Sequence, residues 1–538
     1  MNIPLFVGVD VGTASARAAI FDGSGAMLAQ ASQTIQIWRA PGGIVEQSSN
    51  DIWAAVCHCV RAAVADARID PARISGIGFD ATCSLVVIGR QNSPISVSAS
   101  GDASRNVVVW MDHRATDQAA HVNAGNHPEL RYLGGAISPE MQMPKLMWLH
   151  EHMPKTFEDA DHFFDLADFL TWKATGNATR SLCTLSCKWV YLAHENRFST
   201  SFLQAIGLGV LADERFARIG TNVAPPGTAI GAGLSQTAAD DLGLMVGTAV
   251  AASLIDAHAG GVGSLGGTLS DGSIANPSQQ IAYVFGTSAC IMASGPDPVI
   301  VPGVWGPYQS AMIPGLWLSE GGQSAAGAAI DHLLRSHPAF VEANALANGI
   351  PLAQWLEHRI SQRHTSLSSA VIDVAGLHIV PEFLGNRSPH ADPGARATIS
   401  GLTIEDDLAS LERLYIAGLL GVAYGALQTI MAMRAQGMVL SMIVISGGAG
   451  KSPLVRQLLA DATNMDVVFP QAAQPVLLGS AMLAAVAAGS VADLQAASAQ
   501  MVRSSVINTP NPAFAAVHIG RYQAFTLLQD VERMVRSL

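Results

Sequence analysis

Residues 5–15 of the chain read LFVGVDVGTAS, and this segment is the strongest single indication of the fold class. The apolar run Leu5–Val11 ends in glycine, which predicts a buried β-strand followed by a tight turn. Ala16–Phe21 and Met27–Ile37 predict two further strands, with a turn at Asp22–Gly25 between them. The chain therefore opens with a β-hairpin and not with a simple βαβ series.

The segments that follow alternate between helix and strand patterns. Asn50–Ala67 has the apolar periodicity of a helix, and Ser49 or Asn50 is its predicted cap. Ile74–Phe79 and Val107–Trp110 return to the apolar runs that are typical of strands. This alternation predicts an α/β protein.

The opening pattern recurs about half a chain later. Ile281–Phe285 is again a short apolar run, and Gly286-Thr287 follows it as Gly12-Thr13 follows the first. A chain of 538 residues, of which 49% are hydrophobic, is long enough to bury two cores. We therefore predict two related domains, residues 1–260 and 261–538, each presenting a hairpin loop to a shared cleft.

Bulk composition narrows the range of partners. The net charge is −12 and no block of Lys or Arg stands out, so neither nucleic acid nor an anionic membrane is an expected partner. Ile416–Met433 and Val476–Ala492 are apolar but rich in small residues, which favours buried helices over membrane spans. Residues 1–12 lack the basic region of a signal peptide, so a cytoplasmic location is expected. The 51 glycines predict close contacts between helices and sheets.

The six cysteines are even in number, but the length of the chain and the lack of a secretory signal favour reduced thiols. Cys183 and Cys187 are four residues apart, and no second ligand pair with zinc spacing follows them. The spacing therefore does not predict a metal site.

Asp10 is a candidate metal ligand. It ends a buried-looking strand, where a carboxylate is costly unless it has a partner. Mg²⁺ prefers oxygen ligands and keeps much of its hydration shell, so it is a natural partner. The turn that follows, Gly12, Thr13, Ala14 and Ser15, can direct N–H and hydroxyl donors toward phosphate oxygens. The alternative is a plain β-turn with a surface aspartate.

Asp256 is a candidate catalytic base. In Leu254–Gly260 an acid again follows apolar residues and precedes small ones. A hydroxyl that accepts a phosphoryl group needs a positioned base, and a carboxylate can take its proton. His258 is the rival base, but a lone histidine in such a run is more often structural, so Asp256 is favoured.

Trp110, Asp112 and Arg114 lie within five residues and suit a sugar. An indole packs on the C–H face of a sugar ring or chain, while a carboxylate and a guanidinium bond its hydroxyls. The alternative, a strand end with an ordinary ion pair, stays open on these residues alone.

Together these residues resemble the FGGY carbohydrate kinases of the actin-like ATPase superfamily, over essentially the whole chain. The resemblance rests on the order and spacing of six motifs: Gly8–Thr13, Trp110–Arg114, Asp256–His258, Gly286–Ser288, Gly385–Pro389 and the Gly447-Gly448 turn. It implies two actin-like (ribonuclease H-like) domains with a shared active-site cleft, and transfer of a phosphoryl group from MgATP to a small-molecule sugar.

Finer strings are similar to ribulokinases, in the pentulose kinase branch of the family. They are Gly78–Leu85, Ser138–Gln142 with Pro144-Lys145, Cys187–Trp189 and Glu320–Ser324. The likeness is strongest to kinases of D-ribulose, and L-ribulose, ribitol and xylulose kinases are near relatives. The implied acceptor is the terminal hydroxyl of a ketopentose.

The resemblance also implies roles for individual positions. Asp10 would hold Mg²⁺ through water, and Asp256 would take the proton of the attacking hydroxyl. The positions that would flank the phosphates are Gly12, Thr13, Gly286 and Thr287. Those that would approach the adenosine are Gly327, Asp331, Gly448 and Ser452. Those of the pentulose pocket are Ala81, Trp110, Lys188, Asp256 and Glu320. Ser452 stands where many relatives have asparagine, which weakens the adenosine assignment.

Three alternatives remain. In the first, the acceptor is another ketopentose or a polyol. This alternative stays open because the hydrogen bonds that discriminate between epimers cannot be read from a sequence. In the second, the chain is an actin-like nucleotide switch. The Trp110–Arg114 string, Lys188 and Glu320 argue against it, because a switch has no need of a polar sugar pocket. In the third, the chain is an inactive sugar sensor. The presence of both Asp10 and Asp256 argues against it. A homodimer is expected only at the level of the family.

Overall fold

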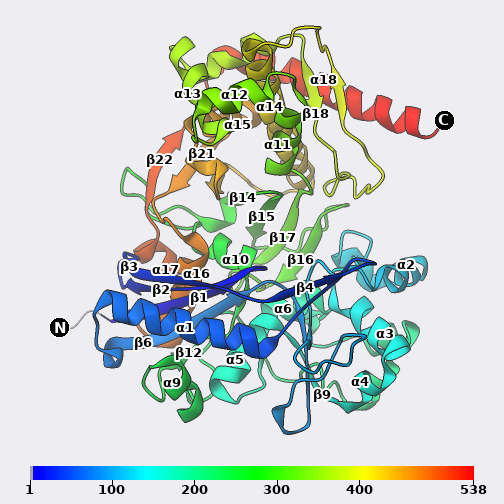
Figure 1. Cartoon of the computed structure of the whole chain (residues 1–538), viewed down its shortest axis with the longest axis vertical. Helices are drawn as coiled ribbons and strands as arrows, with labels where there is room; N and C mark the ends of the chain where they lie inside the picture. The colour runs from blue at the N-terminus through cyan, green and yellow to red at the C-terminus, as the bar shows by residue number, and fades with distance from the viewer. Residues whose placement is uncertain (1–3) are drawn as a thin grey trace.

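The computed structural model describes residues 4–538 and contains two large sheets (Figure 1). The first sheet has the order β12-β6-β1-β2-β3, and β13 also pairs with β6. Its strands are β1 Leu5–Val11, β2 Ser15–Asp22, β3 Met27–Thr34, β6 Ile74–Ala81, β12 Ala249–Val250 and β13 Leu254–Ile255. The second sheet has the order β16-β17-β15-β14-β20-β21-β22. Its strands are β14 Gln280–Phe285, β15 Ala289–Gly295, β16 Trp305–Gln309, β17 Trp317–Gln323, β20 Met442–Ser446, β21 Asp466–Pro470 and β22 Ser504–Asn508.

The two sheets repeat one topology. In the first, β1 pairs antiparallel with β2 and parallel with β6, and β6 pairs parallel with β12. In the second, β14 pairs antiparallel with β15 and parallel with β20, and β20 pairs parallel with β21. The recurrence of Gly-Thr after two apolar runs therefore reflects two copies of the same five-strand arrangement, β3-β2-β1-β6-β12 and β17-β15-β14-β20-β21.

Helices cover both sheets. α1 (Ser49–Ala67) packs on β2 and β3 through Ile52, Val56 and Val60, and Ser48 caps it by accepting from the Asp51 N–H. The cap is thus one or two residues before the predicted positions. We call the part of the protein around the first sheet the first lobe, and the part around the second sheet, which is uppermost in Figure 1, the second lobe. Helices of this upper, second lobe are α11 Gly327–Ser336, α12 Phe340–Ala347, α13 Leu352–Arg363, α14 Leu408–Ala435, α15 Pro453–Thr463 and α18 Ala515–Arg536.

A smaller sheet flanks the first one, in the order β4-β5-β8-β7-β9. Its strands are β4 Ile37–Ala40, β5 Ile44–Gln47, β7 Leu85–Gly89, β8 Val107–Val108 and β9 Ala160–Asp165. The single strand predicted for Met27–Ile37 was wrong in extent, because β3 ends at Thr34 and Ile37 begins a strand of this other sheet. Helices beside it include α3 Gln142–His152, α5 Leu166–Thr175 and α6 Leu182–Lys188.

α14 is long and apolar enough to cross a membrane by length and composition. However, 72% of its most apolar window is buried inside the protein. It packs on α11, α15 and β18 (His378–Val380), and its apolar side chains belong to the core of the upper lobe. This is the behaviour of a core helix.

α16 (Pro475–Ala487) comes from the second part of the chain but packs on β1 and β6 of the first sheet. Gly8 and Gly78 lie in register on these strands, and a Cβ there would come within 2.0 and 2.1 Å of the Leu477 and Ser480 carbonyl oxygens. α16 also packs on α10 (Asp256–Val262), which in turn contacts β14 and β15. The division predicted at residues 260/261 separates the two large sheets along the sequence, whereas α16 returns to the first one.

The buried carboxyl group of Asp165 is expected to make the stability of the protein depend on pH. It is fully buried at the end of β9, and burial, with the nearby Asp168 carboxylate adding to it, raises the pKa of Asp165 to about 8. Its ordinary value is 3.8, so between about pH 4 and 8 the folded chain holds a proton that the unfolded chain has lost. The contribution of this group to the free energy of unfolding is therefore largest at low pH. It falls by about 1.4 kcal/mol per pH unit as the pH rises through that window.

We expect Asp165→Asn to remove this pH dependence, because asparagine keeps an oxygen that can accept from Gln142 and Trp189. Urea unfolding at pH 5 and pH 8 measures it, and the wild type should lose more stability than the variant. Asp161→Asn, at an exposed position of the same strand, is the control. Equal losses in wild type and Asp165→Asn would contradict the assignment.

Candidate active site

Three aspartates lie at the carboxyl ends of neighbouring parallel strands. The register of β1 and β6 places Asp10 opposite Asp80. The register of β13 and β6 places Ile255 opposite Ala81, so that Asp256 follows directly and begins α10. This edge of an open α/β sheet is where ligands bind. The predicted residues Asp10, Ala81 and Asp256 are therefore brought together.

Asp80 belongs to the same group, although no sequence pattern singles it out. It is completely buried, and the Ser480 hydroxyl donates to its Oδ2 at 2.6 Å. Burial, followed by the negative charge of Asp10, raises the pKa of Asp80 well above its ordinary value. Its Oδ1 has no hydrogen-bond partner within residues 4–538. A buried, unpartnered oxygen beside Asp10 fits an oxygen-rich site for a hydrated cation.

Arg17 of β2 forms an ion pair with Asp10 and donates to Gln474 Oε1 at 3.2 Å. It is 37% exposed, whereas the carboxylate of Asp10 is buried. The β1–β2 register, in which Arg17 lies opposite Asp10, explains the contact. A cation at Asp10 would therefore compete with Arg17 for this carboxylate.

Asp256 has the protonation behaviour of a base. Its side chain is half-buried, and Oδ1 accepts from the Ala257 N–H at 2.7 Å. Burial raises the pKa of Asp256 to about 6, and the charge of Asp10 adds to the shift. The carboxylate is thus ionised at neutral pH and able to take a proton.

His258, the rival base, is engaged elsewhere. It is buried, its Nε2 lies 3.2 Å from Glu320 Oε2, and its Nδ1 lies 3.1 Å from Cys183 Sγ. Burial would lower the pKa of His258, but Cys183 and Glu320 raise it above its ordinary range. Because both ring nitrogens are occupied, the geometry favours Asp256 as the base.

The two glycine turns are each closed by a hydrogen bond from the glycine N–H to a serine carbonyl a few residues on. The Gly12 N–H donates to the Ser15 carbonyl at 3.0 Å, and the Gly286 N–H donates to the Ser288 carbonyl at 2.9 Å. A Cβ on either glycine would lie 3.7 Å from that same carbonyl oxygen. In the first turn Thr13 and Ser15 are partly exposed and Ala14 is exposed, and in the second Thr287 is exposed. Both turns are therefore open to a ligand.

The second turn lies against the N-terminus of α11. The Ala326 and Ala328 N–H groups donate to the Thr287 carbonyl at 3.0 Å, and the Gly327 N–H donates to the Gly286 carbonyl at 3.0 Å. A Cβ on Gly327 would come within 2.6 Å of that carbonyl oxygen. Only glycine allows this approach of helix and turn.

A cavity of about 620 Å³ lies between this turn, α11 and the start of α15. It brings together six predicted nucleotide positions: Gly286, Thr287, Gly327, Asp331, Gly448 and Ser452. The hydroxyl of Ser452 caps α15 by accepting from the Val455 N–H at 3.1 Å. Lining residues that the sequence did not indicate include Glu357, Tyr415 and Lys451. Volume and glycine lining suit a nucleotide.

Trp110 links the first turn to the predicted sugar pocket. Its indole Nε1 donates to the Thr13 hydroxyl at 3.0 Å, and its backbone N–H donates to the Ser84 hydroxyl at 3.1 Å. The ring is partly exposed. The strand predicted through Trp110 ends at Val108, so the indole lies in the loop beyond β8.

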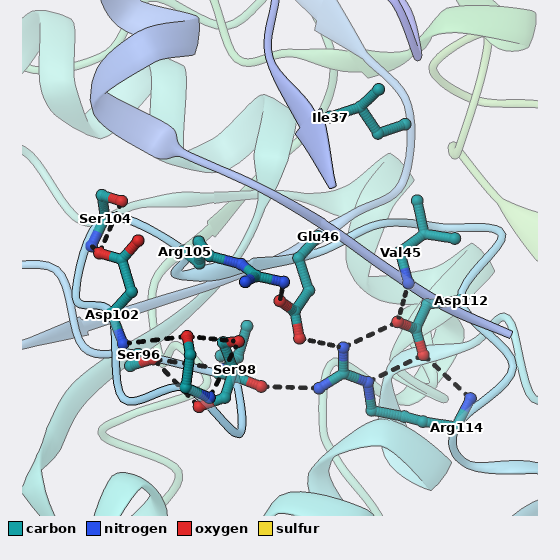
Figure 2. Close-up of polar contacts among 12 residues, drawn as sticks. Ile37, Val45, Glu46, Ser96, Ser98, Asp102, Ser104, Arg105, Asp112 and Arg114 are labelled. Carbon is teal, nitrogen blue, oxygen red and sulfur yellow. Dashed lines mark hydrogen bonds and ion pairs between the residues drawn. The ribbon is translucent and has the colours of Figure 1, made fainter. Parts of the chain in front are cut away.

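Asp112 and Arg114 lie in a buried polar network (Figure 2). Asp112 accepts from the Val45 N–H at 2.6 Å and from Arg114, whose guanidinium also binds Glu46 at 2.8 Å and the Val97 carbonyl at 2.7 Å. The two side chains are 0% and 2% exposed. Their polar groups are bonded within the protein, so this geometry does not support the predicted contact with sugar hydroxyls. It supports a role in holding the loop that carries Trp110.

Lys188 and Glu320 form a second polar group. Lys188 Nζ lies 4.7 Å from the centre of the Trp305 ring, and Arg387 stacks on the same ring at 4.6 Å. Burial opposes the charged form of Lys188, but nearby thiols and Glu320 raise its pKa. Glu320 accepts from Arg387 at 3.5 Å as well as from His258. Within the part of the chain that the structure describes, Lys188 Nζ donates no hydrogen bond, so its donors are available to a ligand.

Comparison with known proteins agrees with this geometry. The N-terminal domain model of the FGGY family of carbohydrate kinases matches residues 5–263, and the C-terminal domain model matches residues 281–488. A human FGGY carbohydrate kinase domain-containing protein is 44% identical over 98% of this chain and 96% of its own length. A Saccharomyces cerevisiae D-ribulokinase is 36% identical over 90% of this chain and 72% of its own. The solved structure of a Rhodospirillum rubrum xylulose kinase superposes with a TM-score of 0.80 over 98% of both chains, at 20% identity. The chain therefore belongs to the FGGY family of carbohydrate kinases and is a phosphotransferase.

Proposed function

We propose that this kinase phosphorylates the terminal hydroxyl of a ketopentose, with D-ribulose as the first candidate. The observation that carries the proposal is the position of Asp256, an ionisable base beside Asp10 at the edge of the first sheet, on a helix that contacts β14. The 36% identity to a yeast protein named D-ribulokinase supports the choice of sugar.

The nucleotide would be held by the cavity of the second lobe. Gly286, Thr287 and Gly327 would surround its phosphates, while Gly448 and Ser452 would approach the adenosine. When bound, ATP supplies the phosphoryl group and Mg²⁺ neutralises its charge. Asp10 would hold Mg²⁺ through water, with Asp80 next to it, and Gly12 and Thr13 would face the phosphates from the first lobe.

The sugar would lie between Trp110 and the Lys188–Glu320 group. Lys188 has free donors for a sugar oxygen, and the methyl side chain of Ala81 leaves space at the end of β6. Asp256 takes the proton from the terminal hydroxyl as that oxygen attacks, and the phosphoryl group is transferred in line. Closure of the two lobes on MgATP and the sugar would exclude water, which would otherwise compete as the acceptor. We further propose a cytoplasmic location.

The test is coupled ADP release with MgATP against D-ribulose, L-ribulose, D-xylulose, L-xylulose, ribitol and glycerol, each compared by kcat/KM. We expect D-ribulose to exceed every other compound by at least about tenfold, because a site built around sugar hydroxyls discriminates strongly. A preference for another compound would move the substrate and keep the mechanism. ADP release that no sugar stimulates would favour a nucleotide switch.

Asp10→Asn should raise the Mg²⁺ concentration needed for half-maximal activity by at least about tenfold, because a neutral amide binds a hydrated cation less strongly. A Mg²⁺ titration at saturating ATP and sugar measures this. Asp22→Asn, at the far end of the same hairpin, is the matched control. An unchanged Mg²⁺ requirement would remove Asp10 from the metal site.

A further inference from the structure

Cys183, Cys187 and His258 meet in the interior beneath the predicted sugar pocket. The two cysteines lie one turn apart on α6, and His258 comes from α10, more than seventy residues later. All three side chains are buried. Their ligand atoms lie within 4.8 Å of one another, and Cys183 Sγ is 3.1 Å from His258 Nδ1. The fold therefore brings His258 to the two cysteines as a third potential metal ligand, which their spacing in the sequence does not indicate.

Glu320 completes the arrangement from β17. His258 Nε2 lies 3.2 Å from Glu320 Oε2, so that Nε2 can donate to the carboxylate while Nδ1 faces the two sulfurs. A metal-bound histidine characteristically donates its other N–H to a carboxylate, which fixes the orientation of the ring. Glu320 is positioned to be this outer partner.

The ligand types select the cation. Two thiolates and one imidazole suit Zn²⁺, with bonds of about 2.3 Å to sulfur and about 2.0 Å to nitrogen. Hard cations such as Mg²⁺ prefer oxygen and are not expected here. On binding, each thiol that carries a proton releases it to solvent, and two thiolates then balance the two positive charges of the ion.

We propose that Cys183, Cys187 and His258 form a three-ligand site for Zn²⁺, separate from the Asp10 site. The ion ties α6 to α10, the helix that begins at Asp256 and contacts β14 of the second sheet. In zinc sites with three protein ligands, water or an added ligand completes the coordination. Binding at a site formed only in the folded chain raises the unfolding temperature.

The experiment is a Co²⁺ titration of the full chain after chelator treatment and reduction of its thiols. We expect saturation at one equivalent, with a thiolate-to-cobalt charge-transfer band and the intense visible bands of tetrahedral Co²⁺. One equivalent of Zn²⁺ should abolish these bands and raise the unfolding temperature. Weak octahedral bands without charge transfer would overturn the proposal. The titration can therefore refute the proposal on the wild-type chain alone, even if a variant fails to fold.

Variants locate the ligands. Cys187→Ser should remove about half of the charge-transfer intensity and weaken Zn²⁺ binding at least about tenfold, because one of two thiolates is lost. Glu320→Gln should weaken binding about 10- to 100-fold and keep the band. Cys59→Ser, which removes a buried thiol on α1, is the matched control and should bind as the wild type does. Wild-type affinity in Cys187→Ser would place the metal elsewhere and refute the site.

Discussion

Replacing Asp256 by asparagine is expected to lower kcat about 10³-fold while leaving the dissociation constant for ATP within about twofold of the wild-type value. A positioned general base contributes about 10²- to 10⁴-fold, and the amide cannot take the proton of the attacking hydroxyl. The nucleotide cavity is lined by residues of the second lobe, and Asp256 is not among them. ADP release measures the first quantity, and calorimetric titration with ATP measures the second.

The control is His258→Gln, which alters the rival base and keeps a group able to hydrogen-bond to Glu320. We expect it to retain far more kcat than Asp256→Asn. If Asp256→Asn lost ATP binding but turned over normally per bound nucleotide, its role as the base would be refuted. If His258→Gln showed the larger loss of kcat, the histidine would take that role.

The pH profile gives a further check on the same residue. Burial raises the pKa of Asp256 to about 6, and only the ionised carboxylate can accept a proton. We therefore expect kcat/KM to be level above about pH 7 and to fall about tenfold per pH unit below about pH 6. A profile that stays flat to about pH 5 would contradict this assignment.

Gly8→Ala is expected to destabilise the protein by about 3 kcal/mol, a large effect for one methyl group. The added Cβ would come within 2.0 Å of the Leu477 carbonyl oxygen, and that oxygen belongs to the backbone of α16, which cannot rotate away. The helix must therefore move off β1. Urea unfolding followed by far-ultraviolet circular dichroism measures the loss.

Gly520→Ala is the matched control, because a Cβ on this glycine of α18 meets nothing within 4 Å. Alanine is favoured over glycine within a helix, so this variant should be as stable as the wild type or more stable. Wild-type stability of Gly8→Ala would show that the backbone of α16 is not in close contact with β1.

Local patterns were sufficient for several of the strands that flank the candidate site. β1 has the predicted bounds, because an apolar run closed by glycine is a signal within the segment itself. Boundaries that depend on a partner strand were less predictable. Met27–Ile37 has a continuous strand pattern, but β3 stops where its pairing with β2 stops.

The candidate site shows the same limit. Asp10 and Asp256 could be predicted, because each is an acid placed between an apolar run and small residues. Asp80 could not, because it matters only through a register that sets it beside Asp10. Asp112 and Arg114 have side chains that suit a sugar, yet their polar groups are bonded to Glu46, Val45 and Val97.

The α/β class, the repeated hairpin with its glycine turn, and the two candidate acids Asp10 and Asp256 could all be predicted from the sequence. These are written in short stretches, where hydrophobic period and turn residues act within a few positions. The packing of α16 on the first sheet, the position of Asp80 beside Asp10, and the meeting of His258 with Cys183 and Cys187 become visible only in the folded chain. Such contacts join segments far apart in the chain, and they depend on strand register and close packing, which no local pattern encodes.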